Sequence, residues 1–114
     1  MSVLPARGEI WGADLNPVRG HEQAGIRPCL VVSTDPFNHG PAELVLVAPI
    51  TTRERRNPLH VPVETAEAGL RERGFIKCED LRSISRGRLR QRIGRVSVST
   101  LTEVEDRLRI LLEL

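Results

Sequence analysis

Residues 28–33, Pro-Cys-Leu-Val-Val-Ser, form a short run that is rich in apolar and β-branched residues. Such residues favour a β-strand, where branched side chains pack well on the pleated surface. Other short apolar clusters lie on both sides of this run, separated by proline, glycine and polar stretches. This arrangement is typical of small antiparallel β domains.

Four further strands are expected around this run. They cover Glu9–Leu15, Leu44–Ile50, His60–Val63 and Phe75–Cys78. The segment His60–Val63 lies between Pro58 and Pro62, and proline cannot donate a backbone hydrogen bond to a neighbouring strand. We therefore expect that strand at the edge of the sheet.

The C-terminal segment has the spacing of an amphipathic helix with one buried stripe. The apolar positions of the stripe are Leu101, Val104, Leu108, Leu111 and Leu112. Ser97 or Thr100 is suited to cap the helix, and Thr100 with Glu103 fits a capping box. We expect this helix to be structural, covering an open end of the sheet or meeting a second subunit.

Length and composition predict one soluble domain, residues 1–114. The chain has 39% hydrophobic and 28% charged residues, which is ordinary for a folded protein. A domain this short builds a deep ligand cleft more easily between two subunits, so dimerisation is expected. No segment approaches the roughly 20 apolar residues of a membrane span, and the N-terminus lacks a signal-peptide pattern. We expect a cytoplasmic protein without a membrane partner.

Positive charge is concentrated in the second half of the chain. Residues 53–95 contain eleven Arg and one Lys against six acids, whereas residues 1–52 contain three Arg against five acids. This surplus suits a polyanion such as RNA, whose phosphates are neutralised by basic side chains. A solvated charged face, or an arginine bias in the coding genome, explains the same pattern equally well.

No cofactor or metal site is indicated. Cys29 and Cys78 lie far apart and form no metal-binding pair, and the three histidines are scattered. The sequence contains no P-loop, G-x-S-x-G, H-E-x-x-H or dinucleotide-binding motif. Most familiar enzyme classes therefore lose support.

Two strand margins carry the remaining candidates for chemistry. Arg27 opens the second strand after a loop of about eleven residues, which is longer than most hairpin loops. Thr51 closes the third strand, directly before the most cationic loop of the chain, residues 51–58. An Arg before a Pro and a Thr after a strand are also common structural choices.

Read as continuous strings, these margins are similar to a known family. The stretch from Asp14 to Ser33, with its Asn-Pro turn, Gly-x-Glu-Gln loop and Arg-Pro strand start, resembles the N-terminal signature of the MazF/PemK toxins. Val47-Ala-Pro-Ile-Thr-Thr52, Asn57-Pro-Leu-His-Val61 and Glu79-Asp-Leu-Arg-Ser-Ile84 resemble later segments of that family. The resemblance runs from about Arg7 to the C-terminus.

The resemblance implies an SH3-like small antiparallel barrel of the MazF/CcdB type with a C-terminal helix, assembled as a homodimer. It implies the toxin of a type II toxin-antitoxin system, a metal-independent, sequence-selective endoribonuclease that cleaves single-stranded RNA. A MazE-like antitoxin is the implied protein partner. The family often has Gln where Asp80 stands here, in a region linked to base recognition, so the base preference of this chain is open.

The family's catalytic Arg and Thr correspond to Arg27 and Thr51. A guanidinium with a pKa above about 12 is a poor base but a good clamp for a phosphate that gains charge in the transition state. RNA supplies its own nucleophile, the 2′-hydroxyl, whose attack leaves a 2′,3′-cyclic phosphate and a 5′-hydroxyl. Glu22 and His60 are candidates for taking the 2′-proton. Glu22 is equally well interpreted as a solvated loop carboxylate or as a hydrogen-bond support for Arg27. His60 is equally well interpreted as a half-buried histidine of an edge strand.

RNA contacts are expected from the first loop, the cationic loop and the segment before the final helix. The predicted residues are Asn16, His21, Gln23, Thr52, Arg53, Arg55, Arg56, Asp80, Arg82 and Arg86. The chain has only three aromatic residues, and Trp11 is expected in the core or a dimer interface, so base stacking is sparse. Binding should therefore depend strongly on salt.

Two other functions remain open at this point. A CcdB-like protein shares the fold but poisons DNA gyrase without catalysis, and it would have no use for Arg27 and Thr51. An RNA-binding barrel without cleavage needs only the charge distribution.

Overall fold

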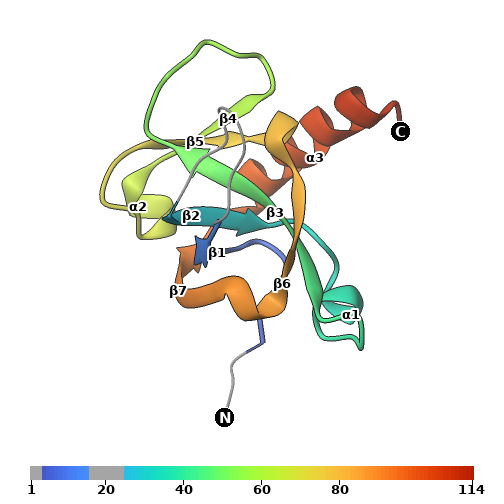
Figure 1. Ribbon diagram of the computed structural model, residues 1–114. Coiled ribbons are helices and arrows are strands. Elements are labelled where there is room, and N and C mark those ends of the chain that lie inside the picture. The colour runs from blue at the N-terminus through green and yellow to red at the C-terminus, as the bar shows by residue number, and fades with distance from the viewer. Residues whose placement is uncertain (1–3, 16–24) are drawn as a thin grey trace.

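The computed structural model describes residues 4–15 and 25–114. Within these ranges the chain forms a curled β-sheet and three helices (Figure 1). The strands are β1 (Glu9–Asp14), β2 (Ile26–Val31), β3 (Leu44–Thr51), β4 (His60–Val63), β5 (Gly74–Lys77), β6 (Arg82–Ser85) and β7 (Leu89–Arg95). The helices are α1 (Asp35–Asn38), α2 (Thr65–Ala68) and α3 (Val98–Leu112), and two 3-10 turns are η1 (Cys78–Asp80) and η2 (Arg86–Arg88).

The strands are paired antiparallel in the order β4-β5-β3-β2-β1-β7. β3 is the centre of this arrangement, because it pairs with β2 on one edge and with both β6 and β5 on the other. The predicted mainly β fold with a C-terminal helix is confirmed, and β4 lies at the end of the strand order, as its prolines indicated. None of the helices in the described ranges is long and apolar enough to cross a membrane.

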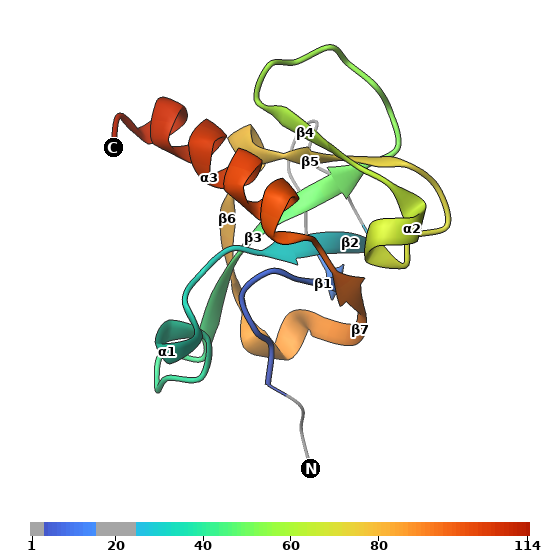
Figure 2. The ribbon, with the colours of Figure 1, turned by 180° about the vertical axis from the view of Figure 1, so that it is seen from behind.

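Two apolar clusters lie on opposite faces of the sheet. In β3, Ala48 and Ile50 belong to the first cluster. Val45 and Val47 belong to the second, because successive side chains of a strand point to opposite faces. α3 crosses the first face and buries Val104 there (Figure 2). β3 therefore contributes to both cores along its length.

Trp11 is a core residue, as expected. Its side chain lies in the second cluster and is only 6% exposed. The indole Nε1 donates a hydrogen bond to Glu9 Oε1 over 3.1 Å, which satisfies its polar atom inside the core. Trp11 is therefore not available as an open stacking platform within one subunit.

The helix α3 begins earlier than its apolar spacing indicates, at Val98 rather than Leu101. The capping residue is Ser97, whose hydroxyl accepts from the Thr100 backbone N–H over 3.1 Å. The capping box expected at Thr100 is wrong, because Thr100 is already a buried residue of the first helical turn. The end of the predicted buried stripe is also wrong: Leu112 is 52% exposed, since α3 extends past the sheet (Figures 1 and 2).

β6 and β7 were not predicted from the sequence. β6 buries one apolar side chain, Ile84, and β7 alternates arginine with residues that are exposed or half-buried. These two strands are held by backbone pairing, β6 with β3 and β7 with β1, and they lack the apolar pattern by which a strand is recognised in a sequence.

Candidate active site

Arg27 and Thr51 lie at neighbouring strand ends on one face of the sheet. The last paired residues of β2 and β3 are Cys29 and Pro49. Arg27 is two residues before Cys29, and Thr51 is two residues after Pro49. Because side chains alternate along a strand, each points to the same face as its paired neighbour. The ladder does not continue through Pro28, which has no N–H to donate.

The same face continues across the adjacent strands. Thr51 is paired with Phe75 of β5, and Arg27 is paired with Ala13 of β1. Lys77, two residues after Phe75, shares the orientation of Phe75. Arg27 is exposed and Thr51 is half-buried, so both side chains lie where a ligand can reach them.

The thiol of Cys29 shows which charged groups are close to this face. Burial raises the pKa of Cys29 to about 12, the nearby positive charge of Arg82 lowers it, and the negative charge of Asp80 raises it. Arg82 and Asp80 therefore lie near the strand that carries Arg27. A thiol with so high a pKa stays protonated at neutral pH and is a poor nucleophile.

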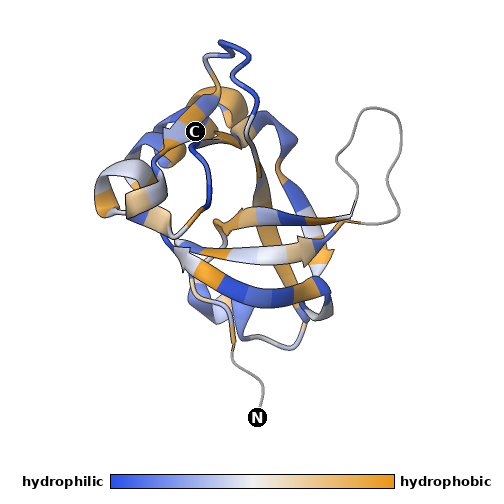
Figure 3. Cartoon of the chain, turned by 90° about the vertical axis from the view of Figure 1, so that its left-hand side faces the viewer, coloured by the Kyte–Doolittle hydropathy of each residue, from blue (hydrophilic) through white to orange (hydrophobic). Residues whose placement is uncertain are grey.

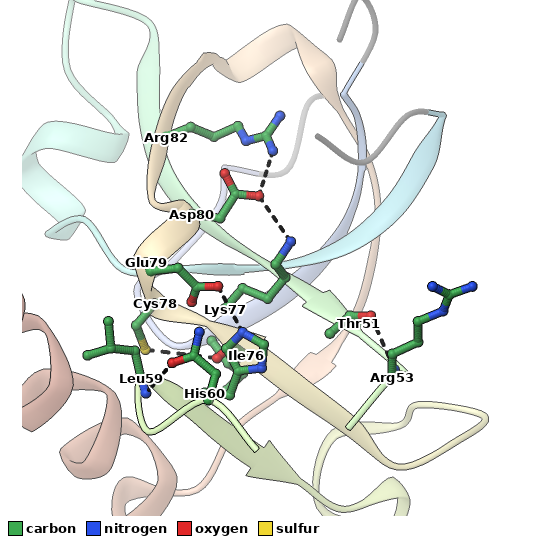
Figure 4. A network of polar contacts seen from close by, with 11 residues as sticks. Thr51, Arg53, Leu59, His60, Ile76, Lys77, Cys78, Glu79, Asp80 and Arg82 are labelled. Carbon is green, nitrogen blue, oxygen red and sulfur yellow. Dashed lines mark hydrogen bonds and ion pairs between the residues drawn. The ribbon is translucent and has the colours of Figure 1, made fainter. Parts of the chain in front are cut away.

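Three charged side chains form an ion network at the end of β5 (Figure 4). Asp80 Oδ2 is 2.8 Å from Arg82 Nη2 and 3.6 Å from Lys77 Nζ. The turn η1 presents Asp80 between the two cations, and pairing of Arg82 with Val47 fixes β6 beside β3. The network has a net positive charge.

His60 is turned away from solvent. Its side chain is 5% exposed, and Nε2 lies 2.8 Å from Glu79 Oε2 (Figure 4). The other ring nitrogen, Nδ1, is buried and has no hydrogen-bond partner among the residues that the structure describes. This environment holds the ring in place but does not present it to a large ligand.

The cationic loop follows directly after Thr51. Its predicted contact residues, Thr52, Arg53, Arg55 and Arg56, are all exposed. The loop is the topmost segment of Figure 1 and is strongly hydrophilic in Figure 3. The backbone N–H of Arg53 donates to Thr51 Oγ1 over 3.2 Å, which links the loop to the site.

Arg86 is not brought together with this group. It follows β6, which pairs with the first half of β3, whereas Thr51 is at the last residue of β3. The Arg86 guanidinium donates to the carbonyls of Asn38 at 2.9 Å and Gly40 at 3.3 Å. These bonds fasten the turn that leads into β3.

Four other predicted site residues, Asn16, His21, Glu22 and Gln23, lie outside the described residues. Two residues were not predicted: Lys77, which belongs to the ion network, and Glu79, which contacts His60. Lys77 is the only lysine in the chain and lies within the predicted strand Phe75–Cys78, a signal that could have identified it. In ranges 4–15 and 25–114, no group of three or more His, Cys, Asp or Glu side chains is arranged to hold a metal ion.

Comparison with known proteins identifies the family. Residues 6–112 match the profile of the PemK-like, MazF-like toxins of type II toxin-antitoxin systems. The chain is 36% identical over 113 residues to the endoribonuclease MazF9 of Mycobacterium tuberculosis, covering 95% of this chain and 96% of that protein.

Solved structures agree with this match. The crystal structure of MazF from Deinococcus radiodurans superposes with a TM-score of 0.86 at 29% identity, covering 99% of this chain and 100% of the other. A MazE-MazF structure from the same organism gives a TM-score of 0.83 at 28% identity, with 99% of each chain covered. The chain therefore belongs to the PemK-like, MazF-like family of toxins of type II toxin-antitoxin systems.

Proposed function

We propose that this toxin is an endoribonuclease that cleaves single-stranded RNA at selected sequences without a metal ion. The observation that carries the proposal is the placement of Arg27 and Thr51 on one face, at adjoining ends of β2 and β3. The relatives named as endoribonucleases support the same reaction class.

In the proposed reaction, Arg27 and Thr51 bind the scissile phosphate. The guanidinium donates to the nonbridging oxygens and stabilises the charge that grows on them in the transition state. The Thr51 oxygen accepts from the Arg53 N–H, and its own hydrogen is available to donate to a ligand. The two residues come from different strands, β2 and β3, and we expect them to contact the phosphate from two sides.

The nucleophile is the ribose 2′-hydroxyl of the substrate. It attacks the neighbouring phosphorus, the bond to the 5′-oxygen breaks, and a 2′,3′-cyclic phosphate and a 5′-hydroxyl form. Of the two candidate bases, His60 is buried against Glu79, which disfavours contact with the 2′-hydroxyl. We assign the proton acceptor to Glu22.

RNA is bound by the positive groups around this pair. The exposed arginine loop and the network of Lys77, Asp80 and Arg82 flank the site on two sides. In the part of the chain that the structure describes, both cations of the network contact Oδ2 of Asp80, and Oδ1 is the oxygen that we propose accepts a hydrogen bond from a base. Binding through phosphates should weaken steeply as salt is raised.

A homodimer and a MazE-like antitoxin complete the proposal. The end of α3 and the residues that follow it expose apolar side chains, with Ile110 64% and Leu114 84% exposed, a surface that a second copy would cover. MazE-MazF complexes of a structural relative support an antitoxin partner. We place the toxin in the cytoplasm, where both partners and mRNA are present.

The test is cleavage of a mixed-sequence RNA in EDTA, with the ends of the fragments mapped. Cutting that persists and leaves cyclic-phosphate ends is expected, and a matched DNA should stay intact. Arg27→Ala should reduce the rate about a hundredfold, as loss of a preorganised charge contact does. If the protein binds RNA without cutting it, or if Arg27→Ala cuts at the normal rate, the proposed reaction at this site is wrong.

A further inference from the structure

The turn η1 has three residues, and a different part of the fold holds each of their side chains. Cys78 is buried in the first apolar cluster, on the face that α3 covers. Glu79 is bound by His60 of β4 at 2.8 Å, and Asp80 is bound by Arg82 of β6 at 2.8 Å (Figure 4). A 3-10 turn this short has poor internal hydrogen-bond geometry. The position of η1 therefore depends on these outside contacts.

His60 is well placed to hold Glu79. In the ladder between β4 and β5 it is paired with Lys77, which lies two residues before Glu79. The His60 side chain is 5% exposed and that of Glu79 is 29% exposed, so the carboxylate reaches from the surface to a ring that is fixed in the interior. An ionised carboxylate only accepts hydrogen bonds, so Nε2 of His60 is the donor.

The stability of the fold does not favour a histidine at position 60. Its Nδ1 is buried and has no hydrogen-bond partner within residues 4–15 and 25–114. A buried polar atom without a partner is destabilising, and an apolar side chain of similar size would avoid this cost. Local choices that cost stability are typical of functional sites. We therefore expect the contact between His60 and Glu79 to serve the function of the protein.

Asp80 is the residue of η1 whose position depends most on this contact. Besides Arg82, its Oδ2 contacts Lys77 Nζ at 3.6 Å. Lysine and arginine side chains have several rotatable bonds, so these two cations alone leave the carboxylate some freedom of orientation. His60 is shorter, buried and part of a paired strand. Its bond to Glu79 fixes the turn at the residue directly before Asp80.

We propose that His60 is a positioning residue, which fixes η1 through Glu79 so that Asp80 presents a single orientation to an RNA base. The inference rests on the proposed function, because it gives His60 a part in the base selectivity of the endoribonuclease. His60 itself does not touch the substrate. By limiting the orientations of Asp80, it favours the one base whose hydrogen-bonding groups match that orientation.

Two substitutions separate the hydrogen bond of His60 from the shape of its ring. His60→Gln places an amide nitrogen near the position of Nε2 and keeps a donor for Glu79, whereas His60→Leu fills space without a donor. The readout is the ratio of kcat/KM for two RNAs that differ only in the base whose preference Asp80→Asn changes. We expect His60→Leu to lower this ratio about tenfold and His60→Gln to retain it. Unfolding transitions of both variants check that the fold is retained.

A control and a double variant show whether the effect passes through Asp80. His39→Leu is the matched control, because His39 is exposed and its Nε2 contacts the Pro5 carbonyl oxygen at 2.7 Å, so the ratio should not change. His60→Leu combined with Asp80→Asn should have the same ratio as Asp80→Asn alone. A further fall in the double variant would overturn the proposal. An equal loss of kcat for both RNAs in His60→Leu, with the ratio unchanged, would also overturn it.

The contact is also measurable without RNA. Amide hydrogen exchange of residues 78–80 in the free protein should be faster in His60→Leu than in the wild type, and normal in His60→Gln. Exchange as slow in His60→Leu as in the wild type would overturn the proposal, because η1 would then be held without His60. Absence of cleavage by the wild-type protein would instead refute the proposed function, and equilibrium binding of the two RNAs would then supply the ratio.

Discussion

The backbone N–H of Arg53 donates to the hydroxyl oxygen of Thr51 across 3.2 Å. Thr51 is the last residue of β3, and Arg53 is the first arginine of the loop that follows. The bond therefore fixes the Thr51 oxygen relative to the first residues of the cationic loop. The arginines of this loop are thus held next to the Thr51 hydroxyl, which is able to donate a hydrogen bond.

Replacement of Thr51 separates the hydroxyl from the shape of the side chain. Thr51→Val should lower the single-turnover cleavage rate about a hundredfold, because a donor to the phosphate is lost. Thr51→Ser keeps the hydroxyl and should retain most of the rate. Rates on a labelled RNA, with thermal unfolding of both variants as the control, check this. Normal cleavage by Thr51→Val would remove Thr51 from the mechanism.

Asp80→Asn should change the RNA sequence that is cut more than the rate of cutting. A carboxylate only accepts hydrogen bonds, whereas an amide also donates, so the preferred base at one position should shift by about tenfold. Sequencing of fragment ends measures the preference. Asp106→Asn, on the exposed side of α3, is the matched control. An unchanged cleavage sequence in Asp80→Asn would argue against base contact by this residue.

Gly94→Ala should destabilise the fold by roughly 1 to 3 kcal/mol, as overpacking does. Its new Cβ would meet the Ala68 carbonyl oxygen at 2.0 Å, so α2 or β7 has to move. Gly87→Ala is the control, because its Cβ would have no atom closer than Ser85 Oγ at 3.6 Å. Urea unfolding of the three proteins gives the comparison, and equal stability of the two variants would contradict the close packing of α2 on β7.

Glu67→Gln should make the fold less sensitive to acid. Partial burial raises the pKa of Glu67, but hydrogen bonds from Thr100 and Ser97 lower it, and the result lies below the usual carboxyl value. The Ser97 N–H, at the start of α3, donates to Glu67 Oε1 over 2.7 Å. A lowered folded-state pKa contributes stability at neutral pH that is lost as the pH falls below about 4.3.

Urea midpoints at pH 7 and near pH 3.5 measure this dependence. The wild-type protein should lose more stability between the two values than Glu67→Gln does. Parallel losses in both proteins would show that this carboxylate is not linked to folding.

Much of the fold was predictable because its central strands are apolar. The strands that bury branched side chains on a core were placed within about two residues of their observed ends. β6 and β7 were missed because they depend on partners far away in the sequence. In the sequence their arginines indicate a solvated charged surface. In the structure, however, Arg92 and Arg95 lie against the buried carboxylate of Glu9.

The placement of the candidate site residues was predictable where it depends on strand order. Arg27 and Thr51 lie at strand ends that an antiparallel pairing brings together. Lys77 and Glu79 were missed because their contacts with Asp80 and His60 arise only when η1 folds back on β4 and β5. Arg86 was grouped with the site by sequence distance, yet the four residues of β6 carry it to the far end of β3.

With Thr51 in its proposed catalytic role, the sharing of β3 between two cores ties the toxin's activity to correct folding of this strand. A shift of β3 by one residue would exchange the side chains that fill the two interiors and would turn Thr51 to the wrong face. A β3 strand paired in the wrong register therefore loses both the packing of the two cores and the position of the Thr51 hydroxyl. RNA cleavage should therefore appear only when folding is complete, so a partly folded chain should not harm the cell that synthesises it.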